Sequence, residues 1–183
     1  MSQPNARLRR ARLPLVAAGS AALVLSLAGC SQPVPIDAAD GASSPDCAAL
    51  VVRLPEVLNQ NPDPNAPETG EEQPERETNA QGTGAWGSPA SVLLRCGVAT
   101  PGPTTDTCYS VNGVDWLMDD TDKPNYRFTT YGRTPAVEVL VDSDVVSGTT
   151  VLTDLSSAVA VIPAEAACTS VDDAAPTEEP AAG

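Results

Sequence analysis

The stretch Cys108-Tyr109-Ser110-Val111-Asn112-Gly113-Val114-Asp115-Trp116-Leu117 decides the fold class. At its centre, Asn112-Gly113 supplies the two residues that most readily adopt the positive φ angles of a type I′ turn. The flanking residues predict a β-hairpin. Because side chains alternate across a strand, one face carries Tyr109, Val111, Val114 and Trp116, and the other carries Ser110 and Asp115.

Strand patterns continue on both sides of this hairpin. Residues 90–98 predict a strand that places Val92, Leu94 and Cys96 on one face. Residues 126–131 and 136–142 predict a second hairpin through Gly132-Arg133-Thr134-Pro135. We expect Phe128 to face Val139 and Thr129 to face Glu138 in that hairpin, with Tyr126 and Phe128 on the core face.

Two segments have apolar residues at helical spacing. The first begins at Ser44-Pro45, with serine at the cap and proline at the first helical position, and the second runs from Ser147-Gly148 to Pro163. The expected fold class is therefore α+β: an antiparallel sheet of about five strands in meander order, with two helices packed on one face, as a two-layer sandwich.

The N-terminus resembles a bacterial export signal. Residues 1–29 combine four arginines with an apolar stretch, and Leu27-Ala28-Gly29-Cys30 matches the lipobox of lipoproteins. We expect removal of residues 1–29 and diacylglyceryl and palmitate lipidation of Cys30. The expected location is the outer face of the cytoplasmic membrane, with the membrane bound through the lipid on Cys30.

Polar segments divide the remaining chain. Residues 30–44 predict a lipidated cysteine followed by a flexible tether, and residues 45–168 a single domain. Within that domain, residues 59–84 are rich in Pro, Glu, Asn and Gly and predict a disordered insertion. Residues 169–183 predict a disordered acidic tail.

The charge of the chain excludes several function classes. It has 24 acidic and 10 basic residues and no histidine, so Ser-His-Asp and Cys-His nucleophiles and histidine-bearing zinc sites are excluded. Removing residues 1–29 takes away four arginines and leaves six basic residues, a net charge near −18. Nucleic acid is therefore a disfavoured partner.

With Cys30 assigned to lipid, four cysteines remain, which predicts two disulfides. Cys96 and Cys108 lie close in sequence, and Cys47 and Cys168 lie near the two ends of the domain. We predict the pairs Cys96–Cys108 and Cys47–Cys168, although four cysteines allow two other connectivities. No Cys-x-x-Cys pair is present, which argues against a tetrathiolate metal site.

Several short motifs together resemble a family of uncharacterised actinobacterial lipoproteins, classed as a domain of unknown function (family 3515). They are Leu54-Pro55 near Cys47, Trp86-Gly87-Ser88-Pro89, Leu94-Arg95-Cys96-Gly97-Val98, Val114-Asp115-Trp116 and residues 131–138. The resemblance covers residues 46–168. It implies lipid anchoring, two disulfides and an envelope location, and it implies no activity.

Strand parity collects polar side chains on the sheet face that the helices leave open. In a chain this acidic, arginines gathered there are a candidate site for a carboxylate or another anion. The ordinary alternative is a solvated face with cross-strand ion pairs. The candidate binding face consists of Arg95, Asp115, Arg127, Thr129, Tyr131, Arg133 and Glu138.

Other candidate sites are weaker. The aspartates at 115, 119, 120 and 122 lack the spacing of a calcium loop, so no metal and no cofactor is expected. Trp116 is expected in the core, and Trp86 at the sheet edge or as a ligand-stacking surface. The leading hypothesis is a non-catalytic binding or assembly module of the cell envelope, with an envelope protein or wall precursor as partner. The alternative is a small glycan enzyme that uses Asp115 and Glu138.

Overall fold

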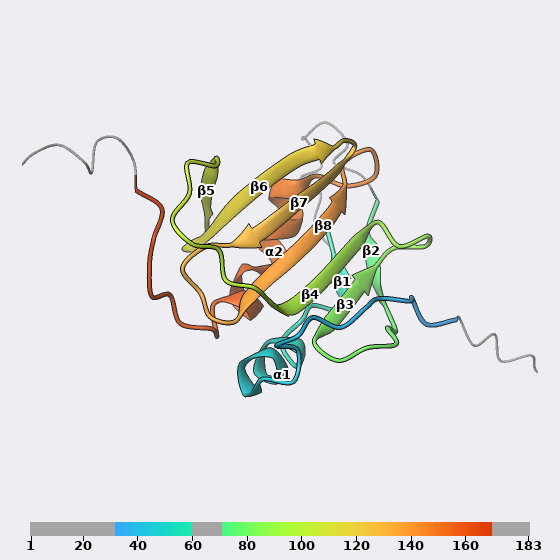
Figure 1. Cartoon of the computed structure of the whole chain (residues 1–183). Coiled ribbons are helices and arrows are strands. Elements are labelled where there is room, and N and C mark those ends of the chain that lie inside the picture. Colours follow the sequence, from blue (N-terminus) through green and yellow to red (C-terminus); the bar gives the residue numbers. More distant parts are fainter. Residues whose placement is uncertain (1–31, 60–70, 170–183) are drawn as a thin grey trace, which may run out of the picture. The chain divides into compact units, whose positions relative to one another are not determined.

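The computed structural model describes residues 32–59 and 71–169 and shows an α+β fold (Figure 1). Its antiparallel sheet has eight strands in the order β1-β2-β3-β4-β8-β7-β6-β5, rather than about five. Two helices accompany the sheet. The elements are α1 (Pro45–Val51), β1 (Val57–Leu58), β2 (Gln73–Arg76), β3 (Thr83–Trp86), β4 (Val92–Val98), β5 (Cys108–Val111), β6 (Val114–Asp122), β7 (Asn125–Thr130), β8 (Ala136–Asp142) and α2 (Gly148–Val159).

Both predicted hairpins are present. Val111 pairs with Val114 across a turn in which Asn112 and Gly113 have φ angles of 49° and 78°, as a type I′ turn requires. In the second hairpin, β7 and β8 pair in the expected register, with Phe128 opposite Val139 and Thr129 opposite Glu138.

The meander order is wrong at one point, because β4 pairs with β8 and not with β5. Both β4 and β8 carry a row of fully buried apolar residues, whereas β5 has no buried residue. The two most apolar strands thus take central positions, and β5 lies at an edge of the sheet.

The expected disordered insertion at 59–84 is wrong for the part that is described. Residues 60–70 lie outside the described residues, but β2 and β3 form beyond them and add to the edge of β4. Trp86 stabilises the pairing of β3 with β4, because its side chain is fully buried and its Nε1 donates to Pro55 O at 2.9 Å. It is a core residue, and neither an edge residue nor an exposed stacking surface. Trp116 is fully buried, as expected.

The helices begin as predicted. Ser44 caps α1 by accepting a hydrogen bond from Cys47 N at 3.1 Å, and Pro45 is the first helical residue. In Figure 1, α2 lies behind the sheet, and it contacts β8, β5, β1 and α1. Leu152, Leu155 and Val159 of α2 join the core cluster with the buried residues of the central strands. No helix within the described ranges is long and apolar enough to cross a membrane.

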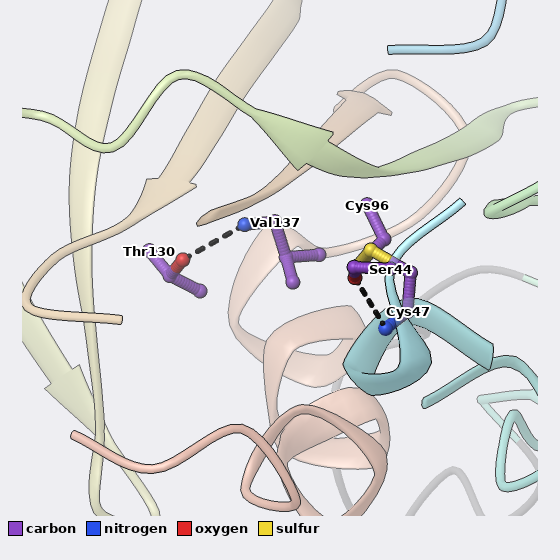
Figure 2. The surroundings of a disulfide bond; sticks show 5 residues. All are labelled: Ser44, Cys47, Cys96, Thr130 and Val137. Atoms are coloured by element: carbon purple, nitrogen blue, oxygen red, sulfur yellow. Dashed lines mark hydrogen bonds between the residues drawn. A yellow bond between two sulfur atoms is a disulfide. The ribbon is translucent and has the colours of Figure 1, made fainter. Parts of the chain in front are cut away.

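Two disulfides are present, but both predicted pairings are wrong. Cys47 of α1 bonds to Cys96 of β4 (Figure 2), and Cys108 of β5 bonds to Cys168. Four strand steps separate β4 from β5, roughly 19 Å at 4.8 Å per step, and a disulfide bridges Cα atoms less than about 7 Å apart. Cys96 and Cys108 are close in sequence only.

The expected flexible tether is also wrong for residues 32–42, which we call the N-terminal strap. Gly41 N donates to Gly97 O at 3.0 Å, and Ile36 and Ala42 are buried. Gly97 has a φ of 97°, and a Cβ there would lie 2.3 Å from Ala42 N. Only glycine allows the strap to approach β4 this closely.

Candidate functional site

The open sheet face brings together three of the predicted residues. Glu138 Oε1 accepts hydrogen bonds from Arg95 Nε and Nη2 at 3.0 and 2.7 Å, and Oε2 accepts one from Arg127 Nη1 at 3.0 Å. The three side chains lie on β4, β8 and β7, which are neighbouring strands. The arginines are thus engaged in cross-strand ion pairs, and the second carboxylate oxygen is also occupied.

Arg133 does not belong to this face. It is 5% exposed, its Nη1 donates to Ile162 O and its Nη2 donates to Gly113 O at 3.1 Å. Burial lowers the pKa of Arg133 and the charge of Asp115 opposes that shift, but a guanidinium remains protonated at any physiological pH. This side chain joins the Asn-Gly hairpin to the end of α2 and offers no surface for a ligand.

A C-terminal segment, residues 163–169, lies beside two other predicted residues. Asp115 Oδ2 accepts from Cys168 N at 2.7 Å, and Tyr131 lines a small hollow beside Cys168. The segment itself is fixed by Gly132 O, which accepts from Glu165 N at 2.6 Å. Thr129, opposite Glu138, remains half-buried on the open face. The seven candidate residues therefore occupy three separate environments.

The carboxylates are poorly placed for glycan chemistry. Glu138 and Asp115 lie on β8 and β6, with β7 between them, and each already accepts protein hydrogen bonds. The nearby Asp119 accepts from Thr121 N at 3.0 Å, which lowers the pKa of Asp119. A catalytic pair needs one carboxylic acid held protonated and one carboxylate free to attack or to activate water. In the described part of the chain, no group of three or more acidic or cysteine side chains could hold a metal ion.

A wide hollow lies elsewhere, between the start of α2 and one end of the sheet. We call this cavity of about 700 Å³ the α2 cleft. It contains three of the six aromatic residues of the chain and one of the two methionines. Its lining residues are Tyr109, Ser110, Val111, Met118, Tyr126, Phe128, Val141, Ser143, Ser147, Gly148, Thr149 and Leu152.

Local sequence explains the shape of the α2 cleft. Tyr126 and Phe128 are two residues apart in β7, so both side chains lie on the same face of the strand. Their rings stack with centroids 6.4 Å apart. Gly148 lets the first turn of α2 approach them, because a Cβ there would lie 3.0 Å from Phe128 Cζ. Tyr109, 44% exposed on the edge strand β5, lies at the mouth.

No charged side chain lines the α2 cleft. Its lining has several hydroxyl groups but no carboxylate, amine, guanidinium or thiol. Lys123 lies near the rim, 6.0 Å from the Tyr126 ring centre, and its hydrogen bond with Asp120 raises its pKa. The amine is therefore protonated, and it cannot serve as a base for the cleft hydroxyls.

Sequence patterns did not predict this cleft, although one signal was available. Strand parity placed Tyr126 and Phe128 together, but both were assigned to the core. Phe128 is 7% exposed and contacts the core cluster, whereas Tyr126 is only half-buried. The close approach of Gly148, at the start of α2, to Phe128 of β7 could not be inferred from parity alone.

Comparison with known proteins gives a family but no activity. The family described as "Protein of unknown function (DUF3515)" matches residues 13–178, most of the chain. No curated protein and no solved structure matches. The chain therefore belongs to the DUF3515 family.

Proposed function

We propose that the protein is a lipid-anchored binding module of the cell envelope that holds an uncharged, mostly apolar ligand in the α2 cleft. The module performs no chemistry on that ligand. It is held on the outer face of the cytoplasmic membrane through the lipid on Cys30. Its ligand is a small envelope component with an aliphatic or aromatic body and a hydrogen-bonding group.

The composition of the α2 cleft carries this proposal. The mature chain has a net charge near −18, yet no charged side chain lines the α2 cleft. Ligand sites typically have a volume of about 300 to 1,000 Å³ and a mostly apolar lining with a few polar groups. The hydroxyl groups of Tyr109, Ser147 and Thr149 supply such groups here. Selection by ion pairing is absent, which favours an uncharged ligand.

Two observations support the location. The lipobox ends at Cys30, and the family match from residue 13 to 178 includes both the apolar stretch and this cysteine. The apolar stretch and the lipobox therefore lie inside the sequence that the family shares, and the four arginines precede it. The disulfides Cys47–Cys96 and Cys108–Cys168 suit an oxidising compartment outside the cytoplasm.

Filling part of the α2 cleft should weaken ligand binding. We expect the uncharged fluorophore N-phenyl-1-naphthylamine to bind the protein saturably, with its fluorescence increased by the apolar lining. Thr149→Phe places a ring in the cleft from an exposed position on α2. The dissociation constant of the fluorophore should be about tenfold higher for Thr149→Phe than for the parent protein, which corresponds to about 1.4 kcal/mol.

Thr153→Phe is the matched control. Thr153 is exposed one helical turn further along α2, does not line the cleft and undergoes the same substitution. The affinity of Thr153→Phe for the fluorophore should equal that of the parent protein. Equal weakening in both variants, or no saturable binding by the parent protein, would refute the cleft as the ligand site.

Loss of the lipid on Cys30 should release the protein from the membrane. In a host cell that expresses the full chain, Cys30→Ser should shift the protein from the membrane fraction to the soluble envelope or culture fraction. Incorporation of labelled palmitate should fall to background, because the lipid-bearing thiol is gone. Cys30→Ser protein that stays in the membrane fraction and keeps the label would contradict lipid anchoring at this residue.

A further inference from the structure

We propose that the N-terminal strap holds the β2–β3 edge of the domain, which consists of residues 76–79 at the end of β2 and in the turn toward β3, directly against the outer surface of the lipid bilayer. This inference rests on the lipid anchor at Cys30 proposed above and adds an orientation to it. A lipidated cysteine alone would leave the domain free to stand away from the membrane.

The strap binds the domain close to its first described residues. Val34 N donates to Glu77 O at 2.8 Å, and Asn79 N donates to Val34 O at 3.3 Å. Ile36 N donates to Asn79 Oδ1 at 2.8 Å, and the Ile36 side chain is 9% exposed. Backbone bonding and apolar burial therefore both begin within three residues of Val34.

Further contacts fix the strap at its two ends. Arg76 of β2 donates from Nη2 to Gln32 O at 3.3 Å, and Gly41 at the far end bonds to Gly97 of β4. Figure 1 draws the strap in blue, passing β3 on its way to α1. The chain thus leaves the domain at the β2–β3 edge and not at the start of α1.

This exit point shortens the connection to the lipid. From Cys30 to Val34 the chain has four Cα steps, which span at most about 14 Å when fully extended. A free connection up to Ser44 would have 14 steps and reach about 50 Å. A compact domain of about 130 residues has a radius of gyration of about 14 Å. The connection is no longer than this radius, so the domain cannot turn over and its β2–β3 edge faces the headgroups.

The packed strap opposes an electrostatic repulsion between the acidic domain and the membrane. A chain with a net charge near −18 is repelled by anionic lipids over distances set by the Debye length, about 8 Å at physiological salt. On a 50 Å tether the domain would move out of this range. The packed strap opposes the repulsion and fixes the position of the domain relative to the bilayer.

Energy transfer from the buried tryptophans to the membrane tests this orientation. Residues 32–183 form a compact unit, so a protein of residues 30–183 is coupled through its Cys30 thiol to a maleimide phospholipid in anionic vesicles with dansyl-labelled lipid. Trp86 and Trp116 are the donors. Twelve Gly/Ser residues inserted between Ser31 and Gln32 should lower the transfer efficiency roughly threefold, because the connection grows from four steps to 16.

A point variant tests the strap itself. Ile36→Asp should lower the transfer as the insertion does, because it places a charge at a buried apolar position. Pro35→Asp adds the same charge at an exposed neighbouring position and should leave transfer unchanged. Tryptophan emission of each variant checks that the core remains folded.

The outcomes separate the two proposals. Equal transfer from the parent protein and the insertion variant, or from Ile36→Asp and the parent protein, would overturn the strap proposal. The chemical coupling does not depend on lipidation in the cell. A failure of Cys30 lipidation in cells would therefore refute the anchor and leave the coupled experiment to judge the strap.

Discussion

Arg133→Met should lower the free energy of unfolding by about 3 to 4 kcal/mol, a large part of the roughly 5 to 15 kcal/mol that stabilises a typical domain. Arg133 is 5% exposed, and its guanidinium donates to Ile162 O and Gly113 O. Methionine keeps most of the apolar stem but leaves both carbonyl groups without this donor. A hydrogen bond to a charged group contributes about 1.5 to 3 kcal/mol.

The position of the guanidinium adds to this effect. Ile162 lies just past the C-terminus of α2, where carbonyl groups lack helical partners and a positive charge is favourable. Gly113 belongs to the Asn-Gly turn, so Arg133 connects the start of β6 to the end of α2. Its loss should loosen the packing of α2 against the sheet.

Arg127→Met is the matched control for this prediction. Its side chain is 40% exposed and forms one ion pair with Glu138, which also keeps its ion pair with Arg95, so we expect a loss of about 1 kcal/mol or less. Urea unfolding followed by tryptophan fluorescence should therefore show a far lower midpoint for Arg133→Met than for Arg127→Met. Equal midpoints would show that Arg133 does not connect these elements in solution.

Local signals in the sequence predicted the elements whose stability depends on neighbouring residues. The Asn112-Gly113 turn fixed one hairpin, and the Ser44-Pro45 cap fixed the start of α1. The register of β7 and β8 followed from alternation, because a shift by one residue would expose Phe128 and Val139.

Features that depend on distant contacts were not predictable in this way. The composition of β2 is polar and does not predict a strand. The segment becomes a strand because it pairs with β1 and β3. The strap has the composition of a tether, and only the contacts of Val34 and Ile36 with residues 77–79 order it. The prediction that Arg133 lies on the open face is wrong because Arg133 is in the loop between β7 and β8, where strand parity does not apply.

Replacing both Cys47 and Cys96 by alanine should lower the free energy of unfolding by about 4 kcal/mol. The bond closes a loop with a sequence separation of 49, and the chain-entropy model gives about 4 kcal/mol for such a loop. Both residues are fully buried, so the lost sulfur atoms also leave a small defect in the packing of α1 against β4. Thermal or urea unfolding in a Cys30→Ser background measures the loss.

Thiol titration of the same variants decides the connectivity. In the Cys47→Ala, Cys96→Ala variant the bond from Cys108 to Cys168 should remain, and unfolded, unreduced protein should titrate no free thiol. A variant with Cys47→Ala and Cys168→Ala retains Cys96 and Cys108, which four strand steps hold roughly 19 Å apart. It should titrate two free thiols and lose the stabilisation of both bonds. A fully oxidised and stable Cys47→Ala, Cys168→Ala variant would instead support pairing by proximity in sequence and contradict the placement of β8 beside β4.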